Sequence, residues 1–254
     1  MTSTLFPTSP YVVAIIGAGS GIGRAAAQHL AREGVTVAAL DRDAEGAAET
    51  VRLVAAGGGK GSAIAADVTD DKGIRAALAS LEQQHGRLDG LVNCAGITGK
   101  TNVKAHEVEL ADFDQVYRIN LRGALVASQA VLPGMLQRGY GRILHIASIA
   151  GKDGNAGMAA YSATKAGLIG LVKTMGKDYA QTGVTINALA PAVIRTPMVA
   201  ALPQATVDYM TAKIPMARCG TLEEAAAMIA WIVSPSCSFT TGFTFDLTGG
   251  RATY

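Results

Sequence analysis

The chain has 254 residues, of which 49% are hydrophobic and 17% charged, and its formal net charge is +2. This length suits one large α/β domain or two small ones. Because the basic residues are scattered, the sequence offers no cationic patch for nucleic acid or an anionic membrane, and we expect neither partner. The four histidines are isolated and the three cysteines lack CxxC spacing, so no metal site is expected.

The N-terminus, MTSTLFPTSP, lacks a basic segment followed by an apolar core, and no apolar run in the chain is long enough to cross a bilayer. Together with cysteines that form no disulfide framework, these features favour a cytoplasmic location. Residues 1–10 are expected to form a short extension before the first strand.

Strands and helices are predicted to alternate along the chain. Apolar runs rich in β-branched residues predict strands at 11–16, 35–40, 62–66, 88–93, 142–147, 184–189 and 243–247. Helices are predicted at 21–33, 44–56, 71–84, 112–137 and 222–233, with another that carries Tyr161 and runs to about residue 180. No Pro/Gly/Ser-rich linker divides this pattern, so we expect a single-domain Rossmann fold with a doubly wound parallel sheet of about seven strands. Residues 191–216 are expected to form a substrate lid.

A glycine-rich loop, GAGSGIG at 17–23, lies between the first predicted strand and the first predicted helix. Its glycines allow a tight turn and a close backbone approach to a pyrophosphate, which the helix N-terminus attracts. Such a loop alone also fits a plain turn, but its position between a strand and a helix favours a nucleotide site. The expected contacts are Gly17, Ser20, Gly21 and Ile22.

Asp41 ends the second predicted strand and has Arg42 beside it. A carboxylate at this position can accept hydrogen bonds from the adenosine ribose hydroxyls and repels a 2′-phosphate, so NAD is favoured over NADP. Arg42 leaves the choice open, since its guanidinium could pair with a phosphate or lie over the adenine.

Two more polar segments follow predicted strands, at the sheet edge where ligands bind in open parallel sheets. Asp67 and Val68 follow the third strand, and Asn93, Ala95 and Gly96 belong to the NCAG segment after the fourth. Asp67 can equally be a helix N-cap, and Asn93 can equally brace its own loop. All five are expected to contact the cofactor.

Ser148, Tyr161 and Lys165 form the candidate catalytic group. Tyr161 and Lys165 are four residues apart, so on a helix they share one face. An ammonium near the phenol would stabilise tyrosinate and move the tyrosine pKa toward neutrality, as a general acid/base requires. Taken alone, Tyr-x-x-x-Lys also fits an ordinary surface pair.

From about residue 12 to 250 the chain resembles the short-chain dehydrogenase/reductase family. The resemblance rests on ordered motifs: GAGSGIG, Asp67, NCAG, Asn120, Ser148, Tyr161-x-x-x-Lys165, Asn187, Pro191 and Thr196. It implies that Tyr161 is the proton donor/acceptor, that Ser148 holds the substrate oxygen, and that Lys165 tunes Tyr161 and binds the nicotinamide ribose. It further implies that Asn120 keeps a water in a proton relay, that Pro191, Val193 and Thr196 contact the cofactor, and that the protein is a homotetramer or homodimer.

Three positions depart from the family pattern. Ile16 stands where a threonine usually braces the glycine-rich loop, Cys94 replaces the second asparagine of NNAG, and Ala192 replaces the glycine of the usual Pro-Gly. None of these changes removes a catalytic group. A catalytically dead scaffold on this fold would lack at least one of the four groups Asn120, Ser148, Tyr161 and Lys165, and all four are present.

The substrate side carries Lys152, Asn155 and Arg195, which could bind a small hydroxy or keto acid, although Lys152 and Arg195 could instead face solvent. The C-terminal GGRATY resembles the branch of the family that oxidises 2-keto-3-deoxy-L-sugar acids of the rhamnonate or fuconate type at C4. We therefore expect an NAD-linked sugar-acid dehydrogenase. A 3-oxoacyl-carrier-protein reductase or a general alcohol dehydrogenase is the alternative.

Overall fold

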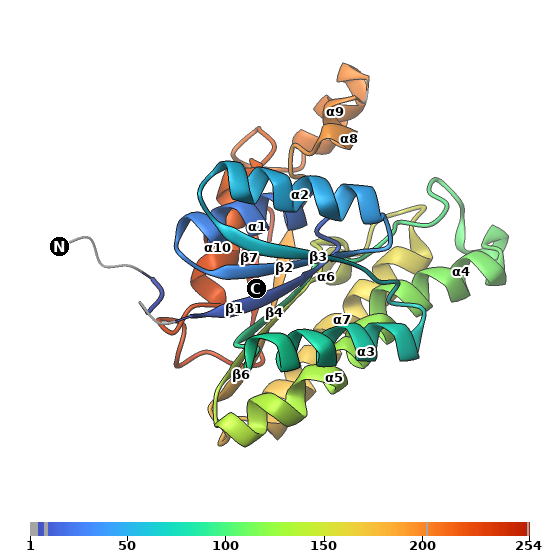
Figure 1. Ribbon diagram of the computed structural model, residues 1–254. Coiled ribbons are helices and arrows are strands. Elements are labelled where there is room, and N and C mark those ends of the chain that lie inside the picture. Colours follow the sequence, from blue (N-terminus) through green and yellow to red (C-terminus); the bar gives the residue numbers. More distant parts are fainter. Residues whose placement is uncertain (1–4, 8–9, 202, 253) are drawn as a thin grey trace.

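The computed structural model describes residues 5–7, 10–201, 203–252 and 254, and its centre is a seven-stranded parallel sheet (Figure 1). The strands lie in the order β3-β2-β1-β4-β5-β6-β7. Their bounds are β1 Val12–Ile16, β2 Thr36–Asp41, β3 Lys60–Ala65, β4 Gly90–Asn93, β5 Gly141–Ile146, β6 Val184–Pro191 and β7 Thr244–Leu247. The chain order reverses between β1 and β4, so the crevice at their carboxyl ends is the expected ligand position in such a sheet.

Helices cover both faces of the sheet. One face carries α3 (Asp71–His85), α5 (Gly123–Arg138) and α7 (Ala159–Asp178), and the other carries α1 (Gly21–Arg32), α2 (Ala44–Ala56) and α10 (Leu222–Ile232). All residues of β1, β4, β5 and β6 are buried, because each of these strands is covered on both sides. This double cover explains the continuous apolar runs in the sequence.

The remaining helices are short and lie near the carboxyl edge of the sheet. They are the 3₁₀ helix η1 (Ala105–Glu107), α4 (Leu110–Tyr117), the π-helical turn η2 (Arg118–Arg122), α6 (Ala150–Asp153), α8 (Pro197–Ala200) and α9 (Gln204–Thr211). The α8 and α9 segment, which falls in the expected lid, projects from the body of the molecule (Figure 1). Residue 202 of that lid lies outside the described residues.

The prediction of one helix over 112–137 was wrong in its interior and its start. Helix α4 begins at Leu110, and the π-helical turn at Arg118–Arg122 interrupts it before α5 begins. Helix α5 does continue through Pro133 to Arg138, as expected. The strand predicted at 62–66 begins two residues earlier, because Lys60 pairs with Thr36 of β2.

The expected N-terminal extension is not wholly outside the core. Residues 1–4, 8 and 9 lie outside the described residues, but Phe6 is buried and its ring centroid is 5.0 Å from that of Tyr11. Within the part of the chain that the structure describes, no helix is long and apolar enough to span a bilayer.

Candidate active site

The glycine-rich loop crosses from β1 to α1 against the start of the NCAG segment. Gly17 has φ +78°, and a Cβ built on it would lie 2.8 Å from the backbone nitrogen of Ala95. The backbone N–H groups of Gly17 and Ala18 donate to the carbonyl of Leu40 at 2.9 and 3.1 Å. This approach brings the ends of β1, β2 and β4 together, and only glycine fits it.

Two residues that the sequence did not single out brace this loop. The Thr50 hydroxyl donates to the Ala18 carbonyl at 2.7 Å, and Arg24 Nε donates to that hydroxyl at 3.0 Å. Arg24 Nη2 also donates to the carbonyl of Gly19. Together they hold carbonyls of the loop, in which Ile16 supplies no hydroxyl. Thr50 lies 32 residues after Ala18, so no local sequence signal could have identified it.

Asp41 joins β2 to the same loop. Its Oδ2 accepts from the Gly19 N–H at 2.8 Å, and its Oδ1 accepts from the Asp43 N–H at 2.9 Å. A carboxylate has about four lone-pair positions, so two backbone donors leave capacity for ribose hydroxyls. The half-buried Asp41 and the exposed Arg42 both line the groove described next.

A groove of about 320 Å³ lies along the carboxyl ends of the strands near the β1/β4 crevice. Eight of the expected cofactor contacts line it: Gly17, Ser20, Asp41, Arg42, Asp67, Val68, Ala95 and Gly96. It is also lined by apolar or small residues that were not among the expected cofactor contacts, namely Ile16, Ala66, Cys94, Ile97 and Ile119. Among the other expected contacts, Gly21 and Ile22 open α1, and the Thr196 methyl lies 3.6 Å from the position of a Cβ on Gly21. Pro191 ends β6, and Val193 lines a second pocket.

The alternative interpretation of Asp67 as a helix N-cap was wrong. Asp70 is the N-cap of α3, and its carboxylate accepts from the N–H groups of Lys72 and Gly73 at 3.2 and 3.0 Å. Asp67 Oδ1 instead accepts from the N–H and the hydroxyl of Thr69, both at 2.8 Å. The Asp67 side chain is exposed and faces the groove.

Asn93 braces the NCAG segment through a buried hydrogen-bond chain. Its Oδ1 accepts from the Ala95 N–H at 3.2 Å, and its Nδ2 lies 3.4 Å from His145 Nδ1. His145 Nε2 lies 2.9 Å from the Ser128 hydroxyl, which donates to the Ala124 carbonyl at 2.9 Å. This direction requires a neutral imidazole with the proton on Nε2. Burial, with a smaller contribution from Lys165, lowers the pKa of His145 to about 3.

Asn120 lies in the π-helical turn between α4 and α5 and is 1% exposed. Its Oδ1 accepts from the Ile97 N–H and its Nδ2 donates to the Ile97 carbonyl, both at 2.9 Å, so it fixes the segment after NCAG. The same Nδ2 is 3.2 Å from the Thr164 hydroxyl, which donates to the Tyr161 carbonyl at 3.0 Å. Such a turn re-aims a helical side chain, and π-helical turns are frequent at functional sites.

Tyr161, Lys165 and Ser148 meet where α7 passes the ends of β4 and β5. Lys165 is 4% exposed, and its Nζ donates to the Ile146 carbonyl at 2.6 Å and lies 5.7 Å from the Tyr161 ring centroid. A Cβ on Gly96 would be 3.3 Å from Lys165 Nζ and from Asn120 Oδ1. Gly96 therefore lines the groove and lies beside two of the four expected catalytic groups, Asn120 and Lys165.

The expected fall of the Tyr161 pKa toward neutrality does not hold in the protein alone. Burial raises the pKa of Tyr161, and the hydrogen bond with Ser148 lowers it by less. Burial also lowers the pKa of Lys165 to about 8. The Lys165 ammonium is directed at a backbone carbonyl, which limits its effect on the phenol.

Lys152 and Asn155 contact residues of the C-terminal region. Lys152 Nζ donates to the Asp246 carboxylate at 2.8 and 3.0 Å, and Asn155 Oδ1 accepts from Arg251 Nη2 at 3.0 Å. Lys152 is therefore paired with a carboxylate and does not extend into solvent. Arg195 is exposed, and among the described residues its side chain makes no hydrogen bond or ion pair.

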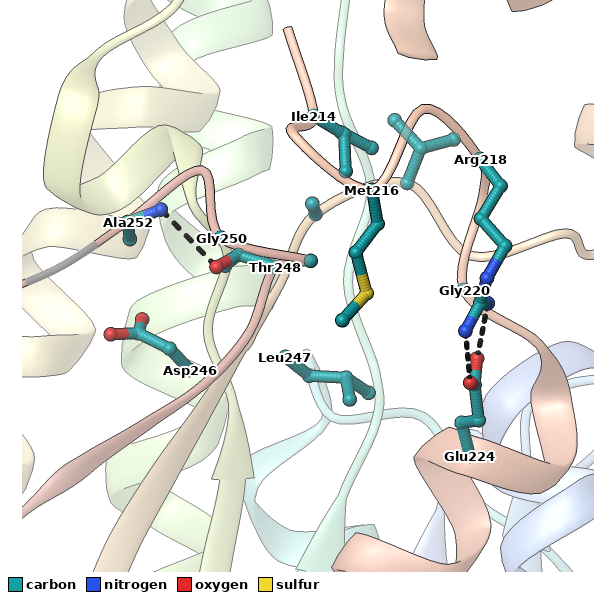
Figure 2. Close-up of a pocket in the computed structure, with 13 residues that line it drawn as sticks. Ile214, Met216, Arg218, Gly220, Glu224, Asp246, Leu247, Thr248, Gly250 and Ala252 are labelled. Atoms are coloured by element: carbon teal, nitrogen blue, oxygen red, sulfur yellow. Dashed lines mark hydrogen bonds and ion pairs between the residues drawn. The ribbon is translucent and has the colours of Figure 1, made fainter.

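A second pocket, of about 390 Å³, lies between the base of the lid and the residues after β7 (Figure 2). Figure 2 shows Ile214 and Met216 facing Leu247 across it, with the Arg218–Glu224 ion pair at one wall. It is also lined by Val193 and Asp246, and so adjoins the segment that the sequence predicts to contact substrate. Among the described residues, no cluster of three or more His, Cys, Asp or Glu side chains could hold a metal.

Comparison with known proteins agrees with this geometry. Residues 17–251 match the family described as enoyl-(acyl carrier protein) reductase. The chain is 43% identical over 240 residues to 2-dehydro-3-deoxy-L-rhamnonate dehydrogenase (NAD(+)) of Sphingomonas sp. strain SKA58, covering 94% of each chain. It is 39% identical to human (3R)-3-hydroxyacyl-CoA dehydrogenase, covering 93% of each. The structure of NAD⁺-bound xylitol dehydrogenase superposes with a TM-score of 0.90 at 30% identity, covering 94% of this chain and 98% of that one.

A Rossmann fold whose glycine-rich groove leads to the buried Lys165, Ser148 and Asn120 and the half-buried Tyr161 defines a dinucleotide-dependent oxidoreductase. The motif order and these matches show that the chain belongs to the short-chain dehydrogenase/reductase family. The Asp41 carboxylate and the close backbone approach at Gly17 fit NAD as the cofactor.

We predict that Gly17→Ala lowers the affinity for NADH by at least about tenfold, because the new methyl group must displace the Ala95 backbone. Gly58→Ala is the matched control, since Gly58 has φ +79° but no atom within 4 Å of its added Cβ. It therefore introduces the same backbone strain away from the groove. The measurement is NADH fluorescence titration of both variants, and equal affinities would contradict the role assigned to Gly17.

We predict that His145 makes the protein less stable as the pH falls from about 6.5 to about 3. In this range the unfolded chain binds a proton that the buried imidazole does not, so stability rises with pH at up to ~1.36 kcal/mol per unit from this group. Urea unfolding at several pH values should show a shallower dependence for His145→Asn than for the wild type. Parallel curves would show that His145 is not the group responsible.

Proposed function

We propose that this protein is an NAD-dependent dehydrogenase that oxidises a 2-keto-3-deoxy-L-sugar acid of the rhamnonate or fuconate type at C4. The reaction class is carried by Asn120 and Lys165 beside Gly96 at the groove, together with the Tyr161 phenol, which is hydrogen-bonded with Ser148 and lies near Lys165. The substrate class is supported by the 43% identity to a relative named 2-dehydro-3-deoxy-L-rhamnonate dehydrogenase. The similar GGRATY terminus, noted in the sequence, supports the same choice.

In this proposal the chain itself manages one proton. Bound NAD supplies the acceptor for the hydride that leaves the carbinol carbon. The Ser148 hydroxyl holds the substrate oxygen. Tyr161 Oη takes the hydroxyl proton as the ketone forms, and a phenol that starts neutral passes its own proton on to the relay of Lys165 and Asn120. The raised pKa of Tyr161 keeps the phenol neutral near pH 7 in the protein alone, which suits proton donation in the reverse, reducing direction.

Lys165 and Asn120 are the two further residues that support this proton transfer. Lys165 Nζ holds a proton below about pH 8 and is anchored by the Ile146 carbonyl, which leaves its other N–H bonds for a ribose hydroxyl. Asn120 fixes the backbone at Ile97, and we assign to it the water of the relay. In the groove, Gly17, Ser20, Gly21 and Ile22 would hold the pyrophosphate, and Asp41 would bind the adenosine ribose.

For the substrate carboxylate we propose Arg195, whose exposed guanidinium follows β6 at the base of the lid. Lys152 and Asn155 would line the substrate side of the site. The Lys152 ammonium is already paired with Asp246, and Asn155 Oδ1 already accepts a hydrogen bond from Arg251. The alternative substrate is a 3-oxoacyl thioester or a general secondary alcohol. The 39% identity to (3R)-3-hydroxyacyl-CoA dehydrogenase supports that alternative.

We further infer a homotetramer or homodimer that works in the cytoplasm. An aromatic cluster supports self-association: the exposed Trp231 of α10 and Phe243, which precedes β7, both pack edge-on against Phe245 of β7. Their ring centroids lie 5.6 and 4.9 Å from that of Phe245. Strand β7 is an edge strand of the sheet, which leaves one side of it without a neighbouring strand.

The mechanism predicts that Tyr161→Phe retains NADH binding and loses turnover by at least about 10³-fold, because the ring remains while the proton-transfer group is removed. Tyr179→Phe, near the end of the same helix, is the matched control and should keep wild-type turnover. Stopped-flow or steady-state NADH absorbance measures turnover, and NADH fluorescence measures binding. Unchanged turnover in Tyr161→Phe would contradict the role of Tyr161 as the proton-transfer group.

The substrate assignment predicts that 2-dehydro-3-deoxy-L-rhamnonate, or its L-fuconate counterpart, is oxidised with NAD at least about tenfold more efficiently than with NADP, since Asp41 repels a 2′-phosphate. The test is a panel of these sugar acids, simple secondary alcohols and acetoacetyl-CoA, with both cofactors in parallel. Slow turnover of every sugar acid beside efficient reduction of the thioester would overturn the assignment.

A further inference from the structure

The chain's own C-terminus folds back on the loop that follows the catalytic serine. Arg251 Nε donates to Asp153 Oδ2 at 3.1 Å, and Arg251 Nη2 donates to Asn155 Oδ1 at 3.0 Å. The Tyr254 hydroxyl donates to the Lys152 carbonyl at 3.3 Å, and its ring centroid is 5.2 Å from Lys152 Nζ. We call Arg251, Ala252 and Tyr254 the C-terminal strap.

A second connection ties the same loop to strand β7. Lys152 Nζ donates to both carboxylate oxygens of Asp246, and the two side chains are only 10% and 25% exposed. The Arg251–Asp153 pair is similarly shielded, at 12% and 29%. Pairs sheltered to this degree are screened less by salt than exposed ones, and the fork of Arg251 fixes two partners at once.

The loop has backbone connections near its ends, from the Ile149 N–H to the Pro191 carbonyl at 3.0 Å and from the Asn155 N–H to the Ser162 hydroxyl at 3.1 Å, and the strap adds side-chain connections between them. Between Ser148 and Tyr161 lie a four-residue helix, α6, and a segment in which Gly154 and Gly157 have φ +71° and +74°. A residue left free in such a segment retains backbone conformational entropy, which opposes a single arrangement. The two ends of this segment carry the hydroxyls of Ser148 and Tyr161, so disorder in it would separate the groups that must hold one substrate oxygen.

We propose that Arg251 is a positioning residue for the reaction: by joining Asp153 and Asn155 it sets the loop that holds Ser148 in register with Tyr161. The inference rests on the proposed dehydrogenase function of the Ser148 and Tyr161 site. Arg251 acts through the loop and does not touch the reacting atoms. It also explains the polar groups of the loop, since Asp153 and Asn155 face the strap and Lys152 faces Asp246.

The experiment compares Arg251→Ala, Arg251→Lys and Asp153→Ala in the full chain. The assay uses 2-dehydro-3-deoxy-L-rhamnonate with NAD, or acetoacetyl-CoA with NADH if the wild type turns over only the thioester. For Arg251→Ala we expect kcat to fall by about tenfold, with the dissociation constant for NADH changed by less than about twofold. Arg251→Lys keeps the charge but not the fork, so its kcat should lie between those of the wild type and Arg251→Ala.

A double-mutant cycle tests whether the contact itself is responsible. If Arg251 acts through Asp153, the Arg251→Ala/Asp153→Ala variant should lose less activity than the product of the two single losses. Arg52→Ala is the matched control, because it removes the arginine of a surface ion pair with Glu49 on helix α2, away from the site. Its kcat should equal that of the wild type.

Three results would overturn the inference: an unchanged kcat in Arg251→Ala, multiplicative losses in the cycle, or a joint fall of kcat, NADH affinity and thermal stability. The last result would show that the strap supports the whole fold and not the loop. If Tyr161→Phe abolishes turnover in the same assay while Arg251→Ala does not reduce it, the dehydrogenase function stands and only the positioning role fails.

Discussion

The burial of one ammonium group, that of Lys165, is the constraint on which the site depends. Removing the charge from water is costly, and burial lowers the Lys165 pKa to about 8. A 2.6 Å hydrogen bond from Lys165 Nζ to the Ile146 carbonyl offsets part of this cost and fixes Nζ between Tyr161 and Gly96. A Cβ on Gly96 would lie 3.3 Å from both Lys165 Nζ and Asn120 Oδ1, so position 96 has no room for a large side chain. The glycine of the NCAG segment is therefore tied to the placement of the buried cation.

Much of the fold could be predicted from the sequence, because its strands are buried on both faces and appear as continuous apolar runs. The π-helical turn at Arg118–Arg122 could not be predicted from the sequence, because its residues continue an ordinary helical pattern. The proposed catalytic groups were recognisable because Tyr161 and Lys165 are close in sequence as well as in space. The bracing of the glycine-rich loop by Thr50 was not, because its partner Ala18 is 32 residues away.

The contrast between contacts that are local in sequence and contacts that are distant also separates the cofactor side of the site from the substrate side. The proposed cofactor contacts lie at strand ends, which meet at one edge of a parallel sheet. Contacts on the substrate side join residues far apart in the chain, such as Lys152 with Asp246 and Asn155 with Arg251. A lysine in a loop carries no local sign of its partner. From the sequence, Lys152 was a candidate cation for the substrate. In the structure its ammonium instead pairs with Asp246 and ties the loop after Ser148 to β7.

The position of Tyr161 shows why the spacing of Tyr and Lys is not sufficient to tune a phenol. The four-residue spacing puts the two side chains on one face of α7, but it does not direct the ammonium at the hydroxyl. Lys165 instead contacts a carbonyl of β5, and burial of the phenol dominates its pKa, which is raised. The Ser148 hydroxyl provides the opposing effect on that pKa within the chain. The proton affinity of Tyr161 thus depends on how Ser148 is placed, and the segment after Ser148 is the one that Lys152, Asp153 and Asn155 tie to the C-terminal residues.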